Sequence, residues 1–360
     1  MIFSSSSIAA VLRYQVESSY FFKKQLIVVV AAFLAGFFIV LKVPTKYYRF
    51  MAPFLAFGII AVLSLLFIYG KVTNGAQSWY RSGIFSIQPA EFAKSIMIVC
   101  MAVFYNRIYN KKNGNKYASL LPLGFGILLA VLIFLQPDLG GALIVAGIAG
   151  LIFVAIPLNK EFKQSIYKII GIGIIIAAIV VVFTGQTLLN SMQSSRLNFL
   201  NPCSRYTEDT GYQVCNGYIA IHNGGLFGVG LGNSTQKYLY LPESHTDFIF
   251  PIICEELGAI VGVATILGYA AILYRIFKIA KKTDNLRNSI LAYGTFLLIL
   301  AHILVNLLGV LGLIPLTGVP LPFLSYGGSF NLNIIIMLFV VQRVAIENSE
   351  SATRKKIQNI

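Results

Sequence analysis

The stretch QLIVVVAAFLAGFFIVL (residues 25–41) contains no charged side chain, and the basic turn KVPTKYYR (42–49) follows it directly. A helix needs about 20 mostly apolar residues to cross the hydrocarbon core of a bilayer. An apolar run of about this length that ends in a charged turn is typical of a transmembrane helix. This pair of segments therefore predicts a membrane protein.

The same alternation of apolar runs and polar turns continues along the chain. We expect eight further spans, near 51–69, 92–109, 119–135, 139–157, 166–184, 248–275, 288–312 and 328–346. The sequence thus predicts an all-α polytopic membrane protein, a helical bundle with nine full spans. Residues 1–346 would form a single integral membrane domain, and residues 347–360 would form a C-terminal tail.

The composition excludes a water-soluble protein. Only 11% of the residues are charged and 57% are hydrophobic, whereas a soluble domain carries about 25% charged residues. In a soluble protein the net charge of +15 would suggest a nucleic-acid partner. In a membrane protein the same excess of cations is expected in cytoplasmic loops, so we expect no nucleic-acid partner.

The basic residues are concentrated in alternate turns. Of the 28 Lys and Arg residues, 19 lie in five segments: 42–49, 107–116, 160–168, 275–287 and the tail from 343. By the positive-inside rule these segments are cytoplasmic, and so is the C-terminus. The long loop at about 185–247 would then be extracytoplasmic.

The first residues, MIFSSSSIAAVL (1–12), are too few to span a bilayer. They resemble the end of a helix whose beginning is absent, and we expect a truncated first span. The alternative is a nine-span protein with a short outer segment.

The segment LPESHTDFIFPIICEELG (241–258) places Asp247 at the mouth of a long apolar run. A partly desolvated carboxylate in that position has a raised pKa and can act as a general base. The alternative role is structural, because Asp is a favoured N-cap and the next helix would begin at Phe248. The spacing alone leaves both roles open.

Two acidic residues, Glu255 and Glu256, follow within the same apolar run, where carboxylates normally face a cavity or a partner. Adjacent helical residues point about 100° apart, so the two cannot line one cavity. We expect one of them to pair with a cation inside the bundle. His245, taken alone, is more typical of a hydrogen-bonded structural group than of a catalyst.

A second polar segment precedes the third expected span and contains Trp79, Arg81, Glu91 and Lys94. If a helix begins near Pro89, then Glu91 and Lys94 share one face at i, i+3 and form a structural ion pair. The alternative is that Lys94 and Arg81 bind a phosphate group at the outer interface, where cations are few.

The long outer loop adds the cations Arg196 and Lys237 and the glycine cluster GGLFGVGLGN (224–233). No βαβ unit surrounds these glycines and the chain has no GxxxxGK[ST] motif, so we expect no nucleotide cofactor. The glycines instead permit tight turns and close backbone approach. Cys203 and Cys215 lie in the same loop on the oxidising side. They either form a disulfide, which would stabilise the fold by roughly 3 kcal/mol, or remain two free thiols. The sequence leaves both possibilities open.

Four motifs together resemble the SEDS family, also called the FtsW/RodA/SpoVE family: QPAEFAK (88–94), QPDLGGAL (136–143), the segment 211–258 and PLTGVPLPFLSYGGS (315–329). The resemblance covers nearly the whole chain and is strongest for the division members. It implies a peptidoglycan glycosyltransferase that polymerises lipid II on the outer membrane face. It also implies ten spans, a class B penicillin-binding protein as partner, and contacts with other division or elongation proteins.

The resemblance also assigns roles to single residues. It implies that Asp247 is the essential acidic residue, and it carries the Glu and Lys of QPAEFAK to Glu91 and Lys94. The sequence departs from the family at Ser78, where members often have Arg before the Trp of this loop. Arg81 is the candidate substitute for that charge.

In the implied reaction Asp247 is expected to act as the base that activates a sugar hydroxyl, or as a ligand of a Mg²⁺ or Mn²⁺ ion. Lys94, Arg196 and Lys237 are the candidates for binding the pyrophosphate. Further candidate substrate-binding residues are Glu91, Arg81, Trp79, His245, Glu243 and Ser325. A lipid II flippase, or a scaffold that activates a penicillin-binding protein, are the alternative functions.

Overall fold

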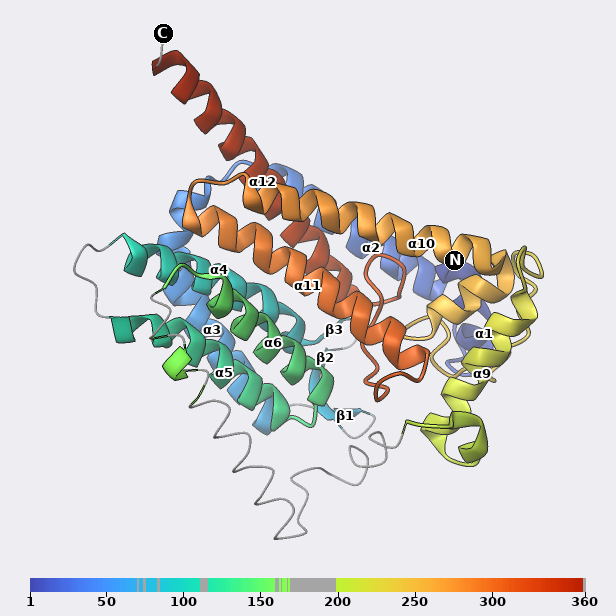
Figure 1. The fold of residues 1–360 in the computed structure, drawn as a ribbon. Coiled ribbons are helices and arrows are strands. Elements are labelled where there is room, and N and C mark those ends of the chain that lie inside the picture. Colours follow the sequence, from blue (N-terminus) through green and yellow to red (C-terminus); the bar gives the residue numbers. More distant parts are fainter. Residues whose placement is uncertain are drawn as a thin grey trace.

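The computed structural model describes residues 1–69, 71–73, 76–82, 85–110, 116–158, 162, 164–166, 168 and 199–358. Figure 1 shows a bundle of long helices that run roughly side by side. Seven helices in the described part are long and apolar enough to cross a membrane. They are α2 (Tyr20–Ala35, prolonged by η1, Gly36–Val40), α3 (Tyr48–Tyr69), α4 (Pro89–Tyr109), α5 (Leu120–Phe134), α10 (Ile249–Lys281), α11 (Leu286–Val310) and α12 (Gly328–Gln358).

These helices coincide with seven of the nine expected spans. The expected span at 139–157 is α6 (Leu139–Ala155), an apolar helix of 17 residues. The expected span at 166–184 lies outside the described residues except for residues 166 and 168. Shorter helical elements are α1 (Ile2–Leu12), η2 (Thr45–Tyr47), η3 (Lys116–Ser119), η4 (Pro202–Arg205) and α9 (Asp209–Gly224). The chain is a multi-pass helical membrane protein, with seven candidate spans in the described part.

Helix α4 lies at the centre of the bundle, where it packs against α3, α5, α6, α11 and α12. Its side chains Met97, Ile98 and Met101 are fully buried. A helix covered on several sides can carry ionisable groups, because they face other helices rather than lipid. Glu91 and Lys94, in the first two turns of α4, are buried in this way.

A small three-stranded antiparallel sheet departs from the all-α expectation. It consists of β1 (Lys71–Thr73), β2 (Ala76–Ser82) and β3 (Phe85–Ile87), in that order. Trp79 pairs with Lys71, and Tyr80 pairs with Ile87. The hydroxyl of Tyr80 donates a hydrogen bond of 3.0 Å to the carbonyl of Val62, which ties the sheet to α3. β-Branched and aromatic residues in these short strands favour the extended backbone.

Helix α10 breaks at Gly258, whose φ of +83° is strained for any residue with a Cβ. The break leaves helix carbonyls without their usual donors, and the cluster 224–233 supplies two donors, the amides of Val229 and Gly230. The amide of Val229 donates to the carbonyl of Glu255 at 2.9 Å. A Cβ on Gly228 would lie 2.3 Å from the carbonyl oxygen of Glu256. The predicted close backbone approach is therefore an approach to α10.

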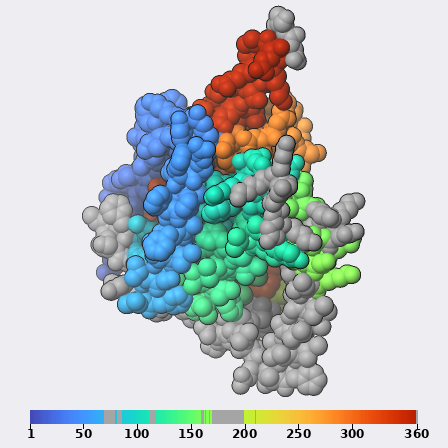
Figure 2. Space-filling view, turned by 90° about the vertical axis from the view of Figure 1, so that its left-hand side faces the viewer, coloured from blue at the N-terminus to red at the C-terminus, as the bar shows by residue number. Residues whose placement is uncertain are grey.

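Helix α12 has 31 residues, so it is about 46 Å long at 1.5 Å per residue, longer than a hydrocarbon core of about 30 Å. Figures 1 and 2 show its C-terminal part rising beyond the rest of the bundle. The expected boundary at 346 falls inside this helix. Glu347 still belongs to the bundle, because it accepts hydrogen bonds from the amide of Thr45 at 2.7 Å and the side-chain amide of Asn288 at 2.7 Å.

Candidate functional site

Asp247 lies at the end of the bundle at which α4 and α10 begin and α11 ends, which we call the loop end. Its exposed fraction is 6%. The hydroxyl of Thr246 lies 3.1 Å from Oδ1 of Asp247 and 2.8 Å from Oε2 of Glu243. Helix α10 begins at Ile249 with Phe248 as its N-cap. Asp247 thus lies one residue before the cap position.

The backbone at Asp247 is held from α11. The side-chain amide of Asn306 donates hydrogen bonds to the carbonyl oxygens of Asp247, at 2.7 Å, and of Val319, at 2.8 Å. Gly318 has a φ of +71°, and a Cβ there would lie 3.6 Å from Oδ2 of Asp247. The loop 311–327 therefore lies directly beside the carboxylate.

Ser325 joins this loop to the Asp247 turn and is fully buried. Its hydroxyl donates a short hydrogen bond to the carbonyl of Thr246 and accepts one of 2.8 Å from the amide of Leu321. Its own carbonyl accepts a bond of 2.8 Å from Asn331. Ser325 therefore holds the loop 311–327 against the Asp247 turn, and its side chain is not exposed to a ligand.

His245 is enclosed by aromatic rings. Its ring centroid lies 4.8 Å from that of Phe21 and 5.8 Å from that of Tyr326. Burial, and next the positive charge of Arg13, lower the pKa of His245 to about 4. The imidazole is neutral at physiological pH, and it supports the fold of the turn next to Asp247.

A buried polar cluster occupies the first turns of α4. Nζ of Lys94 lies 2.7 Å from Oε1 of Glu91 and 3.1 Å from Nε2 of His302. The predicted helix start at Pro89 and the predicted i, i+3 ion pair are both present. Lys94 is 1% exposed. The amino group of Lys94 is therefore enclosed by protein and contacts Glu91 and His302.

His302 and Asn306 are the residues that the sequence interpretation missed. They lie one turn apart on α11, so one face of this helix contacts both the Lys94 cluster and the Asp247 backbone. The available signal was their polarity within an apolar run, since polar side chains at membrane depth normally mark a functional or packed interior. Within the described residues, Nδ1 of His302 and Oε2 of Glu91 are buried without a hydrogen-bond partner.

Lys237 is paired inside the protein rather than presented to a ligand. Its Nζ lies 2.9 Å from Oε1 of Glu256, and the hydroxyl of Ser4 lies 2.6 Å from the same oxygen. Glu255 points elsewhere and accepts hydrogen bonds from the residues after the glycine cluster, among them Thr235 at 2.9 Å. The expectation that one of the two glutamates pairs with a buried cation is confirmed for Glu256.

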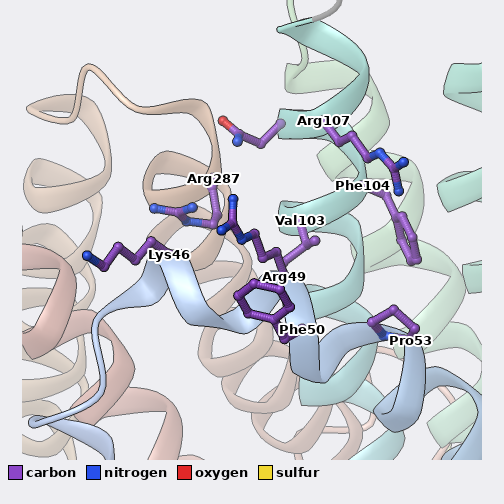
Figure 3. Close-up of a pocket in the computed structure, with 9 residues that line it drawn as sticks. Lys46, Arg49, Phe50, Pro53, Val103, Phe104, Arg107 and Arg287 are labelled. Atoms are coloured by element: carbon purple, nitrogen blue, oxygen red, sulfur yellow. The ribbon is translucent and has the colours of Figure 1, made fainter.

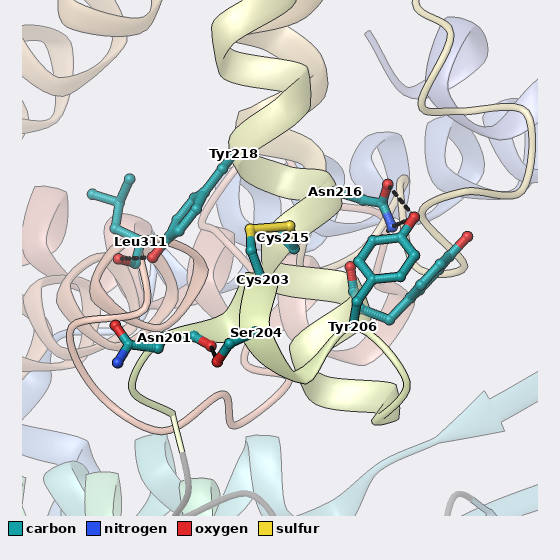
Figure 4. The surroundings of a disulfide bond; sticks show 9 residues. Asn201, Cys203, Ser204, Tyr206, Cys215, Asn216, Tyr218 and Leu311 are labelled. Carbon is teal, nitrogen blue, oxygen red and sulfur yellow. Dashed lines mark hydrogen bonds between the residues drawn. A yellow bond between two sulfur atoms is a disulfide. The ribbon is translucent and has the colours of Figure 1, made fainter.

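Cys203 and Cys215 form a disulfide with an S–S distance of 2.02 Å, which joins η4 to α9 (Figure 4). On the same helix, the hydroxyl of Tyr218 donates a hydrogen bond of 2.8 Å to the carbonyl of Leu311. The disulfide and this contact connect the segment 199–224 to the loop that lies beside Asp247.

The remaining candidates belong to other segments of the chain. Trp79 and Arg81 lie on β2 of the small sheet, and Arg196 lies outside the described residues. Glu243 faces Arg13, whose Nη1 is 3.6 Å away. The side chain of Arg13 is 42% exposed, which makes it a cation near the Asp247 turn that sequence reasoning did not consider.

The arrangement suits proton transfer more than metal binding by the protein alone. A carboxylate whose backbone is fixed by Asn306 can accept a proton from a hydroxyl at hydrogen-bond distance. Among the described residues no group of three or more His, Cys, Asp or Glu side chains could hold a metal ion. A divalent cation at Asp247 would need further oxygen atoms from a ligand or water.

Relatives of this chain cover almost its whole length. The family model FtsW/RodA/SpoVE, described as a cell cycle protein, matches residues 1–350. The chain is 36% identical to the probable peptidoglycan glycosyltransferase FtsW of Bacillus subtilis, over 99% of this chain and 89% of that protein. It is 35% identical to stage V sporulation protein E of the same species, over 94% of this chain and 89% of that protein.

Solved structures share the fold. A chain of a peptidoglycan synthase complex matches with a TM-score of 0.71 and 24% identity, over 91% of this chain and 90% of that chain. The rod shape determining protein RodA of Thermus thermophilus matches with a TM-score of 0.63 and 22% identity, over 96% and 94%. The family resemblance is thus confirmed. This chain belongs to the FtsW/RodA/SpoVE family of multi-pass membrane proteins.

Proposed function

We propose that this chain is a peptidoglycan glycosyltransferase that polymerises lipid II into glycan strands on the outer face of the cytoplasmic membrane. The observation that carries this proposal is the 36% identity, over 99% of the chain, to a protein named as a probable peptidoglycan glycosyltransferase. Several relatives named FtsW match at 33 to 36% identity and stage V sporulation protein E matches at 35%, so the proposed role is in cell division or cell shape.

Asp247 is the proposed catalytic base. Chain growth requires a sugar hydroxyl of one lipid-linked molecule to attack the anomeric carbon of another, and lipid pyrophosphate leaves. The base must stand beside that hydroxyl and accept its proton. The placement of Asp247 at the loop end, with its carbonyl held by Asn306 and its carboxylate beside Gly318, supports this role.

The departing pyrophosphate requires positive charge nearby. Arg196 and the exposed Arg13 are the proposed ligands for it. Lys94 and Lys237 are buried in ion pairs with Glu91 and Glu256 respectively. We therefore propose that they support the structure around the site and do not bind the pyrophosphate. The sheet residues Trp79 and Arg81 are proposed to contact the substrate from the side.

A divalent cation is compatible with this site. Mg²⁺ is commonly held by one or two carboxylates together with substrate phosphates and water. Asp247 would supply the carboxylate, and the lipid pyrophosphate would supply the remaining anionic oxygens. Such an ion would neutralise charge on the leaving group.

The proposed topology places the loop end outside and the C-terminus in the cytoplasm. This topology has nine spans, a large extracytoplasmic loop at about 185–247 and a C-terminal tail after 346. The concentration of 19 of the 28 basic residues in alternate turns supports this orientation. A class B penicillin-binding protein is the proposed partner, supported by the match to a chain of a peptidoglycan synthase complex.

The decisive experiment is polymerisation of lipid II by the purified chain in detergent, alone and with its penicillin-binding protein. Detergent removes the two leaflets, so a flippase would produce no glycan there. Asp247→Asn should lose activity, whereas Asp284→Asn, which changes an exposed carboxylate far from the site, should retain it. No glycan from the wild-type chain under either condition would overturn the proposed function, and wild-type rates for Asp247→Asn would overturn the proposed base.

A further inference from the structure

A cavity of about 470 Å³ opens at the end of the bundle opposite Asp247, where α3 and α11 begin and α4 ends. We call this the basic end. Figure 3 shows the side chains that line the cavity. Its lining comprises Lys46, Arg49, Phe50, Pro53, Val103, Phe104, Asn106, Arg107 and Arg287. The cavity therefore combines four cations with an apolar wall and has no carboxylate.

The four cations are not neutralised by neighbouring acids. Among the residues that the structure describes, none of the four lies within ion-pair distance of an Asp or Glu. Arg287 interacts electrostatically with Glu347 at longer range. That carboxylate already accepts hydrogen bonds from Thr45, Asn288 and Arg343. Positive charge is thus concentrated in the cavity, and no carboxylate of the described residues lies within ion-pair distance of it.

Arg287 provides a second indication that an anion belongs here. Its Nε is buried and has no hydrogen-bond partner among the described residues. A guanidinium N–H that is removed from water without a partner is costly, so it is normally satisfied by a ligand or water. Arg49 lies beside Arg287 in Figure 3, and its guanidinium carbon is 4.6 Å from the ring centre of Phe50.

The apolar wall continues onto the lipid-facing side of α3. Phe50, Phe54 and Phe57 are 57%, 81% and 77% exposed. At spacings of four and three residues they follow one face of a membrane-spanning helix. A molecule with its anionic group in the cavity could thus extend its hydrocarbon part along these rings.

We propose that the cavity binds the phosphate headgroup of an anionic phospholipid from the leaflet at the basic end. The phosphate lies between Arg49 and Arg287, with Lys46 and Arg107 adding charge, and an acyl chain lies along Phe50, Phe54 and Phe57. Basic pockets between transmembrane helices bind such headgroups elsewhere. A soluble phosphate or nucleotide would leave the aromatic face unused, which is why a lipid is the occupant that the geometry selects.

The test uses the full chain in nanodiscs of phosphatidylcholine, with or without phosphatidylglycerol. Phosphatidylglycerol should raise the unfolding temperature, and the chain extracted with detergent should retain one such lipid in native mass spectrometry. Arg49→Gln/Arg287→Gln should lose at least half of both effects. The matched control, Lys278→Gln/Lys281→Gln, removes the same charge at the basic end of α10, outside the cavity, and should keep both.

The outcomes separate the alternatives. If both double variants lose the stabilisation by phosphatidylglycerol and the retained lipid to the same extent, the effect is a general response to surface charge. That result would overturn the proposed site. Protection of the detergent-solubilised chain by inorganic phosphate alone, with no added effect of phosphatidylglycerol, would overturn the lipid assignment. Arg49→Gln alone changes an exposed side chain, so it provides a folded variant with an intermediate loss if the double variant is unstable.

Discussion

Asn306 on α11 donates hydrogen bonds to the carbonyl of Asp247, at 2.7 Å, and to the carbonyl of Val319, at 2.8 Å. One side chain thus holds together the turn that presents the carboxylate and the loop that lies beside it. The position of the proposed base depends on a residue 59 positions further along the chain. Four predictions concern this contact, the ion pair of Glu91 and Lys94, the helix break at Gly258 and the burial of His245.

Asn306→Ala should reduce the rate of lipid II polymerisation by about 10- to 100-fold, because a small displacement of a reacting group costs that much. It also removes a hydrogen bond from each of two buried carbonyls, at about 1–3 kcal/mol each. The rate is measured by gel analysis of glycan products. Asn288→Ala, which removes the bonds to Thr45 and Glu347 at the other end of the same helix, is the control for lost stability. An equal loss of rate in both variants would contradict a positioning role.

Lys94→Met should destabilise the protein by about 3–5 kcal/mol, because it leaves the buried carboxylate of Glu91 without its cation. The double variant Glu91→Gln/Lys94→Met removes both charges and should recover most of that loss. The measurement is thermal unfolding in a mild detergent. If the double variant is less stable than Lys94→Met, the two side chains are not acting as a pair.

Gly258→Ala should destabilise the fold by about 1–3 kcal/mol, because few residues with a Cβ tolerate this backbone conformation. The added Cβ would also lie 2.2 Å from the carbonyl oxygen of Leu226. Gly268→Ala is the matched control in the same helix, since nothing lies within 4 Å of its added Cβ. The control should be neutral or stabilising, and a similar loss in both variants would contradict the need for a break at Gly258.

The stability should fall as the pH decreases from about 6.5 to about 4, partly because of His245. Burial lowers the pKa of this imidazole from 6.5 to about 4. In that window the unfolded chain binds a proton that the folded chain does not, so unfolding becomes more favourable as the pH falls. The full effect is about 3 kcal/mol. His245→Gln should flatten this part of the pH profile in thermal unfolding.

The exposed His222 on α9 provides the control for His245. His222→Gln should leave the pH profile unchanged, because this side chain is exposed to solvent in the folded chain. A profile for His245→Gln that is as steep as the wild type would show that other groups cause the loss of stability.

The sequence alone determined the membrane-spanning architecture. Apolar runs and basic turns are local properties, because a helix in lipid must satisfy its own backbone and be apolar along its length. The predicted spans therefore coincide with seven candidate membrane helices. The sequence also predicted the family and the start of α4 at Pro89, and both predictions are confirmed.

Only the tertiary structure decided which polar residues meet. Lys237 looked like a ligand for pyrophosphate, and it pairs with Glu256. His302 and Asn306 had no role predicted from the sequence, and they link Lys94 to the Asp247 turn. These partners are separated by 19 to 208 residues along the chain. No local pattern encodes such pairs, because the cost of burying a charge is offset only by the group that folding brings to it.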